Sequence, residues 1–383
     1  FIGFEWLQPL PGFGMYFYFV LMGFFGLAIM LGYRYRIAIT SYTILWAGVY
    51  FMQKSSYNNH YYLLLLISFL LIFLPANKYA SLDVKQNRIS EENTMPYWIN
   101  LLFIIQIAIV YVFASLAKFY PDWLDGTFTK NLLSGTTSRP FFLELFSQKW
   151  FYLFIAYAGI LFDLLIVPFL LFKKTRTLAL IASVIFHIFN SITLQIGIFP
   201  FFALTFALFF YEPETIRRLF LRKKPKLEDE NLSQNLYGKR IVYFLMIPYL
   251  IIQIALPLRH HFIEGDVLWT EEGHRLSWRM MLRERNGYIT IQIKDLKTGS
   301  VSIYNYRKNL TNKQAQNLAT KPDFIWQYCQ RIKEEYKGKP IAIYIDCKNS
   351  INRKEYKSLI DPNYDMAKAE WNYFAHNEWI LLY

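Results

Sequence analysis

The sequence predicts a polytopic α-helical membrane domain followed by a mixed, β-rich domain outside the cytoplasm. Hydrophobic residues make up 54% of the 383 residues, aromatic residues 19% and charged residues only 18%, which lies outside the range of ordinary soluble domains. Apolar runs long enough to cross about 30 Å of hydrocarbon recur along the first two thirds of the chain and then stop. We therefore expect a membrane domain over residues 1–257 and an outer domain over residues 258–383.

The apolar runs predict about eight membrane-spanning helices, at about 20 residues for each crossing. The third and seventh runs are short for a full crossing. The chain begins with Phe1 rather than Met, and its first residues look like a loop outside the cytoplasm rather than a signal peptide. We therefore expect one further span to precede this sequence. The predicted spans lie at residues 12–32, 37–53, 61–76, 97–117, 150–172, 177–195, 196–212 and 240–258.

The distribution of the basic residues predicts the orientation of the chain in a bilayer. A net charge of +13 could suggest a nucleic-acid partner, but the basic residues lie in alternate loops, as the positive-inside rule requires. We therefore expect a lipid bilayer and no nucleic acid as partner, with these loops in the cytoplasm and the outer domain on the other side. The loops after the first, third, fifth and seventh runs carry Arg34, Arg36, Lys78, Lys85, Arg88, Lys173, Lys174, Arg176, Arg217, Arg218, Arg222, Lys223, Lys224 and Lys226.

The outer domain is predicted to combine strands with one helix. Residues 288–294 (YITIQIK) and 301–306 (VSIYNY) alternate in polarity and are separated by a turn sequence at 295–299, which indicates a hairpin. A helical stretch at 323–336 and a further strand at 340–345 follow. About 125 residues are enough for a separate core.

The sequence does not indicate a metal site. Cys329 and Cys347 both lie in the outer domain, with no His or Cys at metal-ligand spacing around them. A disulfide between them is permitted by the compartment but not required by the sequence. The adjacent pair His260 and His261 is poorly placed to share one metal ion. We predict that no metal is bound.

A lysine at the end of an apolar run is the first candidate functional residue. Lys118 closes the run at 98–116 and is followed by Phe119, Tyr120 and Trp123. A lysine at a helix end is either an anchor whose amine reaches the interface or an amine kept uncharged by apolar surroundings, so that it can act as a base. The aromatic neighbours favour the second interpretation.

Other polar residues within or beside the apolar runs allow two interpretations each. His187 and Asn190 share one helix face and either bond neighbouring helices or line a cavity. Asn59 and His60 form either a capped turn or part of a site, and the predicted topology places them on the same side as Lys118. Asp163, deep in the fifth run, is interpreted as a structural hydrogen-bond partner rather than a catalyst.

These clusters and their order resemble the vitamin K-dependent γ-glutamyl carboxylase family, in a bacterial-type form. The resemblance extends over nearly the whole chain. It is carried by residues 56–60 (SYNNH), 76–83 (ANKYASLD), 114–126 (ASLAKFYPDWLDG), 186–191 (FHIFNS), 196–200 (IGIFP), 276–281 (LSWRMM), 343–352 (IYIDCKNSIN) and 360–362 (IDP).

The resemblance implies an enzyme that couples two reactions. A weak base deprotonates reduced vitamin K, whose reaction with O2 gives the epoxide and a base strong enough to remove the γ-proton of a glutamate. The carbanion then adds CO2 to give γ-carboxyglutamate. The implied co-substrate is reduced vitamin K, and the implied partner is a glutamate-containing polypeptide. The implied location is a bacterial inner membrane, or the endoplasmic reticulum membrane of a eukaryote.

The resemblance also implies roles for residues of the membrane domain. Lys118 corresponds to the family's base, although animal members carry two adjacent lysines where this chain has Ala117 and Lys118. Asn59 and His60 match positions beside the reacting centre, where they would bond quinol oxygens or stabilise negative charge. His187 and Asn190 match a motif that shapes the same cavity.

Four further residues are implied to contact the substrates. Phe199, Met280 and Met281 would pack on the naphthoquinone ring, since aromatic and thioether groups suit a flat apolar surface. Arg285 would pair with the glutamate carboxylate, because a planar guanidinium suits bidentate recognition. We expect Met280, Met281 and Arg285 to fold over the membrane cavity.

The sequence leaves two alternative functions open. A quinol epoxidase that does not carboxylate peptides efficiently would share every predicted site residue. A non-catalytic transporter or scaffold of the wider transmembrane family should show paired broken helices or inverted repeats, and the sequence shows neither.

Overall fold

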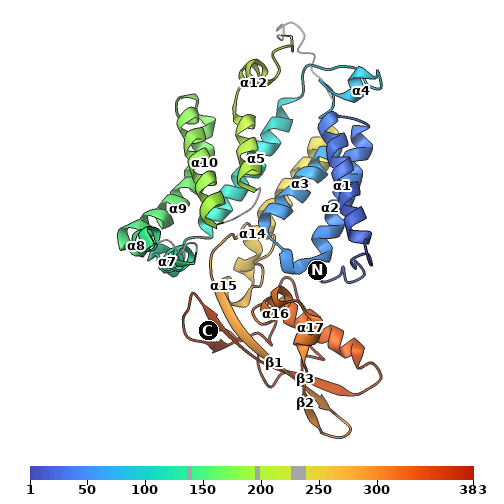
Figure 1. The fold of residues 1–383 in the computed structure, drawn as a ribbon, viewed down its shortest axis with the longest axis vertical. Coiled ribbons are helices and arrows are strands. Elements are labelled where there is room, and N and C mark those ends of the chain that lie inside the picture. Colours follow the sequence, from blue (N-terminus) through green and yellow to red (C-terminus); the bar gives the residue numbers. More distant parts are fainter. Residues whose placement is uncertain (136–139, 195–198, 226–238) are drawn as a thin grey trace. The chain divides into compact units, whose positions relative to one another are not determined.

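The chain folds into two compact units, which are described separately. The computed structural model describes residues 1–135, 140–194, 199–225 and 239–383. The first unit comprises Phe1–Val110 and Leu165–Gln253, and the second comprises Tyr111–Leu164 and Ile254–Tyr383. Figure 1 shows the elements with the labels used below. The predicted domain boundary after residue 257 stays a prediction.

Five helices are long and apolar enough to cross a membrane by length and composition. They correspond to five of the eight predicted runs. The second run forms α2 (Tyr35–Met52) and the third forms α3 (Asn59–Phe73), whereas the seventh begins at residues outside the described part and continues into α11 (Phe199–Thr205). The count of eight spans therefore stays a prediction. The five helices are Gly14–Leu31, Tyr97–Leu116, Lys149–Leu171, Lys173–Thr193 and Val242–Phe262.

The first unit begins with three packed helices, α1 (Gly14–Leu31), α2 and α3 (Figure 1). Asp83 fixes the start of α2, because its carboxylate accepts hydrogen bonds from the backbone N–H groups of Arg34 at 2.8 Å and Tyr35 at 3.0 Å. These N–H groups have no partner within the helix, so an acidic side chain there stabilises the helix N-terminus.

Polar contacts join α14 (Ile247–Leu258) to two other helices of the first unit. The hydroxyl of Tyr249 donates to Gln106 Oε1 at 2.5 Å, and Gln253 Nε2 donates to the hydroxyl of Tyr62 at 3.0 Å. Gln106 belongs to α5 (Tyr97–Leu116) and Tyr62 to α3. Side-chain hydrogen bonds of this kind are a usual means of joining helices inside a bilayer. The unit also contains α4 (Leu82–Lys85), α10 (Lys173–Leu194), η2 (Phe206–Phe210) and α12 (Pro213–Phe220).

The membrane-side part of the second unit packs around Trp123. This residue lies in α6 (Pro121–Leu124), its indole donates to Ala156 O at 3.0 Å, and its ring contacts Phe128. Phe128 belongs to α7 (Thr127–Ser134) and Ala156 to α9 (Lys149–Leu171). The short helices after α5 are thereby held against α9. Helix α8 (Pro140–Ser147) lies between α7 and α9 in the chain.

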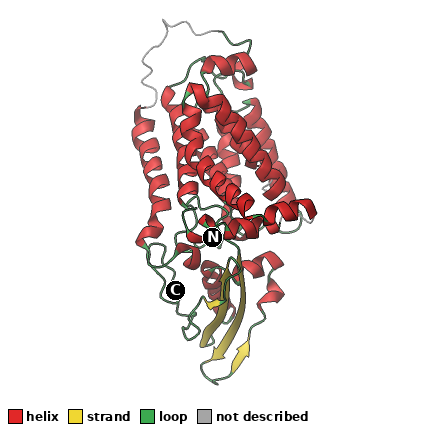
Figure 2. Ribbon diagram, turned by 90° about the vertical axis from the view of Figure 1, so that its left-hand side faces the viewer, coloured by secondary structure: helices red, strands yellow, loops and turns green. Residues whose placement is uncertain are grey.

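The outer part of the second unit is a four-stranded antiparallel sheet in the order β2-β1-β3-β4. The predicted hairpin is confirmed, because Asp295 accepts hydrogen bonds from the N–H groups of Lys297 and Thr298, and Gly299 takes a positive φ of 72°. The long strands appear as a twisted yellow pair in Figure 2. The strands are β1 (Arg285–Asp295), β2 (Val301–Ile303), β3 (Ile341–Ile351) and β4 (Lys357–Ser358).

One face of this sheet is covered by α17 (Pro322–Glu335), the predicted helix, and by α16 (Asn312–Leu318). Their apolar residues form one core with the inward side chains of β1 and β3. Cys329 and Cys347 both lie in this core as free thiols. The fold of the outer part therefore rests on ordinary apolar burial rather than on a disulfide.

Replacing Ile345 by Ala should destabilise the sheet. Ile345 is fully buried in β3, and truncating a buried Ile to Ala typically costs about 2–5 kcal/mol. Hydrogen exchange of the β1 and β3 amides in detergent should become correspondingly faster. Ile303, which is 76% exposed, provides the matched control, since Ile303→Ala should leave these rates unchanged. Equal effects of the two substitutions would contradict this description of the core.

Candidate active site

Lys118 lies just beyond the end of α5 with its amine directed at a carboxylate. Its Nζ donates to Asp163 Oδ2 at 2.5 Å and to the carbonyl oxygen of Ala114 at 3.0 Å. The residue is only 8% exposed. The carbonyl of Ala114 belongs to the last turn of the helix, where carbonyls lack a partner within the helix and attract a cation. The amine is therefore held from two sides.

Aromatic and aliphatic groups shield this amine. Its nitrogen lies 5.4 Å from the ring centroid of Trp123, whereas Phe119 is 55% exposed. The neighbouring Ala117 packs against Leu268 and Leu282. Of the aromatic neighbours named from the sequence, Trp123 is thus the one in contact with the amine. Lys118 is thereby largely shielded from solvent.

The contact between α5 and α9 sets the separation of Lys118 and Asp163. Ser115 Oγ donates to the carbonyl oxygen of Ile160 at 3.1 Å, one turn before the Lys118–Asp163 contact on each helix. Residues three apart lie on the same helix face. The two polar contacts therefore lie in register along one interface, and the first supports the second.

Asp122 ties the segment after Lys118 to the sheet. Its carboxylate accepts hydrogen bonds from Asn352 Nδ2 at 2.8 Å and from Lys354 Nζ at 2.5 Å. Asn352 lies just after β3. Its side-chain oxygen accepts a hydrogen bond from the N–H of Glu284, and its own N–H donates to the carbonyl oxygen of Glu284. Through Asp122 and Asn352, the segment that follows Lys118 is thus linked to Glu284, the residue before β1.

A second group of the predicted residues meets in the first unit. The ring of His60 stacks on that of Phe199 with centroids 3.5 Å apart and an interplanar angle of 8°, and His187 meets Phe199 edge-on at 6.2 Å. Asn59 is buried and accepts a hydrogen bond from the hydroxyl of Tyr57 at 3.0 Å. Asn190 lies half-buried one turn after His187 on α10. The rings of His60, Phe199 and His187 thus form one aromatic cluster.

The segment that carries the two methionines has a strained backbone. Four non-glycine residues between 271 and 281, namely Glu271, Leu276, Trp278 and Met281, take positive φ values of 49–62°. Such a conformation costs roughly 1–2 kcal/mol for each residue and persists where packing enforces it, commonly at ligand sites. Met280 lies half-buried in this segment. The role of Met280 and Met281 in binding a quinone stays a prediction.

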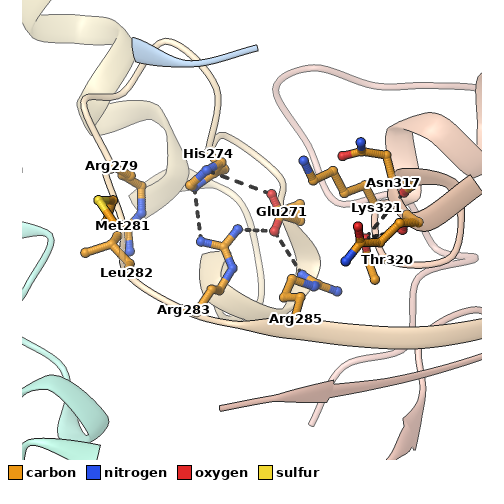
Figure 3. Close-up of a pocket in the computed structure, with 11 residues that line it drawn as sticks. Glu271, His274, Arg279, Met281, Leu282, Arg283, Arg285, Asn317, Thr320 and Lys321 are labelled. Carbon is orange, nitrogen blue, oxygen red and sulfur yellow. Dashed lines mark hydrogen bonds and ion pairs between the residues drawn. The ribbon is translucent and has the colours of Figure 1, made fainter. Parts of the chain in front are cut away.

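This segment forms one wall of a pocket of about 340 Å³ (Figure 3). Four cationic side chains line the pocket, namely Arg279, Arg283, Arg285 and Lys321. Glu271 contributes a carboxylate. Burial opposes ionisation of Glu271, but Arg283 and Arg285 outweigh it and hold the pKa of this carboxyl well below its ordinary value. The remaining positive charge favours an anionic ligand. The polar and charged lining residues are Glu271, His274, Arg279, Arg283, Arg285, Gln316, Asn317, Thr320 and Lys321, and Met281 and Leu282 complete the pocket.

Two other groups in the pocket have shifted pKa values. Burial, followed by Arg275, lowers the pKa of Lys321 to about 8. Burial, followed by Arg283, lowers the pKa of His274 well below its ordinary value. In Figure 3 the side chain of Lys321 extends toward Glu271, and within the described chain no carboxylate pairs with its ammonium at 4 Å or less. Lys321 is therefore available to a ligand.

Arg285, in contrast, already bonds several protein atoms. Its Nη1 donates to the carbonyl oxygens of Leu268 at 3.2 Å and Trp269 at 2.7 Å and to Glu271 Oε1 at 3.1 Å. Its Nη2 donates to Asn349 Oδ1 at 3.2 Å. The predicted role of Arg285 in binding a glutamate carboxylate stays a prediction. In this structure the guanidinium also organises the pocket wall.

Sequence reasoning did not find the partners of three groups that the structure places at these sites. Asp163 was interpreted as a structural hydrogen-bond partner, and it accepts a hydrogen bond from Lys118, but the sequence analysis did not name that partner; one acid and one base in two apolar runs were the available signal. Glu271 and Lys321 come from segments fifty residues apart and had no local pattern to connect them.

Comparison with known protein families gives two matches that together cover most of the chain. The model of the HTTM domain matches residues 1–214, which is more than half of the chain. The model described as "Vitamin K-dependent gamma-carboxylase, lumenal domain" matches residues 238–383. No solved structure matches the chain.

Replacing His274 by Asn should reduce the acid sensitivity of the outer part. The folded state keeps His274 uncharged, whereas the unfolded chain protonates it below a pKa of about 6.5. The free energy of unfolding should therefore fall as the pH falls through about 6.5, and His274 contributes to that fall. Urea unfolding at pH 7.5 and 5.5 measures it. The loss between these pH values should be smaller in His274→Asn and unchanged in the control His261→Asn; equal losses in all three proteins would contradict the assignment.

Proposed function

Because the chain belongs to the vitamin K-dependent gamma-carboxylase family, we propose that it couples epoxidation of reduced vitamin K to γ-carboxylation of glutamate residues by CO2. The family implies reduced vitamin K as co-substrate and a polypeptide as substrate. The apolar helices and the lumenal-domain match make the chain a multi-pass membrane protein with a lumenal C-terminal domain. The membrane is that of a bacterial cell, with this domain on the periplasmic side, or the endoplasmic reticulum membrane if the source is eukaryotic.

The observation that carries this proposal is the shielded amine of Lys118. A base that removes a proton from a quinol needs a lone pair and surroundings from which water is excluded. Lys118 is buried, and its nitrogen lies beside the ring of Trp123. A purely anchoring lysine would instead extend its amine into the interface. The burial favours the catalytic role over the anchoring role.

Asp163 has a positioning role in this proposal. Lys118 can accept a proton only when it is uncharged, whereas in the structure its Nζ donates to Asp163 Oδ2 at 2.5 Å. The contact as found therefore represents a resting arrangement that fixes the position of the amine. Lys118 becomes a base once its proton has moved to Asp163 or the contact has opened.

The residues of the first unit fit a flat aromatic co-substrate. Reduced vitamin K supplies, by reaction with O2, the strong base that removes the glutamate γ-proton. His60 and Phe199 present stacked rings of the kind that hold a naphthoquinone, and Asn59, His187 and Asn190 offer polar groups for its oxygen atoms. In the second unit Met280 and Met281 offer polarisable thioethers.

The cationic pocket is suited to the carboxylate of the polypeptide substrate. It has an excess of positive charge, and Lys321 has no carboxylate partner among the described residues. We assign Lys321 as the group that attracts the glutamate carboxylate and Arg285 as a second cation that pairs with it. The bound carboxylate would then occupy the same unit as Lys118.

Lys118→Arg and Lys118→Ala should both abolish product formation. Arginine keeps a cation beside Asp163 but does not release its proton near neutral pH, so it cannot act as the base. We expect epoxide formation to fall at least about 100-fold in both variants. The assay combines purified protein, reduced vitamin K, labelled CO2 and a Glu-containing peptide, and measures epoxide and labelled peptide.

Lys130→Ala serves as the control, because Lys130 is an exposed lysine of α7 and its loss leaves the Lys118 amine and its contacts intact. It should retain epoxidation. Unchanged epoxidation in Lys118→Arg would refute the role of Lys118. Epoxide without labelled peptide in the native protein would identify a quinol epoxidase, and neither product would indicate a transporter or scaffold.

Lys321→Met should raise the KM for the Glu-containing peptide about tenfold at pH 7, with a much smaller change in kcat, because a buried cation contributes to binding an anion. In the native protein this KM should rise as the pH increases through about 8, where Lys321 loses its charge. The variant should lack that rise. Lys337→Met, at an exposed site, is the control. A native pH profile retained in Lys321→Met would contradict the assignment.

A further inference from the structure

A second hollow of the outer part lies beside the first pocket and contains mostly uncharged polar and aromatic groups. Its volume is about 420 Å³, and it is lined by the start of β1, by η6 (Tyr306–Asn309) and by α16. Gln316 lines both this hollow and the cationic pocket. The two spaces are therefore neighbours within one unit. We call the second space the strand-edge hollow.

The edge of β1 along this hollow carries no neighbouring strand in the described chain. Strand β2 pairs only with residues 292–294 of β1, whereas β3 pairs with β1 over its whole length on the other side. Beyond β2 the N–H of Tyr304 still donates to the carbonyl oxygen of Ile291 at 2.9 Å, and the chain then forms η6, whose Tyr306 and Arg307 line the hollow. Asn286, Gly287 and Tyr288 of β1 line the hollow, and on this side no strand of the described chain pairs with them. An open strand edge offers N–H and C=O groups to an extended peptide.

The side chains around the hollow also suit a peptide. Tyr288 and Tyr356 are about half exposed, and their rings lie 5.5 Å apart. The guanidinium of Arg307 lies 5.5 Å from the ring of Tyr306. Tyrosine and arginine are the residues that most often anchor protein interfaces, because each combines apolar area with hydrogen-bonding groups. Their grouping beside an open strand edge distinguishes this hollow from an ordinary polar surface.

We infer that the strand-edge hollow binds an extended stretch of the polypeptide substrate next to the glutamate whose carboxylate enters the cationic pocket. This inference rests on the proposed function for the position of that glutamate. The stretch would add main-chain hydrogen bonds to the open edge of β1. Its apolar side chains would lie on Tyr288 and Tyr356, and an acidic side chain would pair with Arg307.

Gly287 lines the hollow at the point where the chain after α16 packs against β1. A Cβ placed on Gly287 would lie 2.5 Å from the carbonyl oxygen of Ala319 and 2.7 Å from Asn349 Nδ2. The carbonyl oxygen of Ala319, just after α16, thus packs closely on the β1 backbone at this point. The position requires glycine for this packing.

The test compares long and short peptides on the full-length protein in detergent. The long probe is a twelve-residue peptide with one Glu, flanked by a tyrosine and an aspartate, and the short probe is a blocked tripeptide with a central Glu. In Tyr356→Ala we expect KM to rise about tenfold for the long peptide and to stay unchanged for the tripeptide. Tyr373→Ala is the matched control, because Tyr373 is 47% exposed and Tyr356 is 46% exposed.

Charge reversal in the protein and methylation of the peptide backbone distinguish specific from nonspecific peptide binding. Arg307→Glu should weaken binding of the long peptide, and a peptide with lysine in place of its aspartate should recover that binding. Arg331→Glu, on α17, is the control for charge reversal. Methylation of alternate backbone nitrogens of the peptide should abolish binding, since it removes the hydrogen bonds to the strand edge.

Binding is also measured without turnover, by fluorescence anisotropy of the long peptide with Gln in place of its Glu. If the protein makes no epoxide but Tyr356→Ala still weakens this binding, the proposed function fails and the peptide site stands. If the protein carboxylates the long peptide and both Tyr356→Ala and Arg307→Glu act like the native protein, the function stands and the peptide site is refuted. Equal loss with the tripeptide and the long peptide would also refute it.

Discussion

The contact between Lys118 and Asp163 is the interaction on which the proposed chemistry depends. Both side chains are buried, and removing either charge from water is expensive unless the two are paired and hydrogen-bonded. The 2.5 Å separation and the additional bond to Ala114 meet that condition. The Ser115 contact between the same helices and the ring of Trp123 then keep the amine fixed and shielded. Each feature would be weaker without the others.

The outer part contributes a different kind of site. The strained segment that contains Met281 places cations from several segments around one pocket, and Glu271 neutralises part of their charge. Asp122 connects the segment after Lys118 to Asn352 and Lys354, next to the sheet. The second unit therefore combines a buried amine with a pocket that has an excess of positive charge. The proposed carboxylation of a polypeptide uses both.

Local patterns in the sequence predicted the hairpin of β1 and β2 and helix α17, because alternation and helical spacing report directly on buried faces. The resemblance brought His60, His187 and Phe199 together, and the structure places their rings in contact. The pairing of Lys118 with Asp163 was not predictable in this way. It depends on how two apolar helices are rotated, and an almost uniformly apolar helix has no strong face to define that rotation. The cationic pocket lies beside a segment in which four non-glycine residues have positive φ values, and no pattern in the sequence predicted that conformation.

Chemical rescue of Lys118→Ala tests the central claim most directly. Small amines added to this variant can occupy the vacated space and replace the missing base. If Lys118 is the base, epoxide formation should return on addition of amines, and the rate should increase with the basicity of the amine, since general-base catalysis follows that dependence. A variant that stays folded and gains no activity from any amine, while the native protein forms epoxide, would contradict the account.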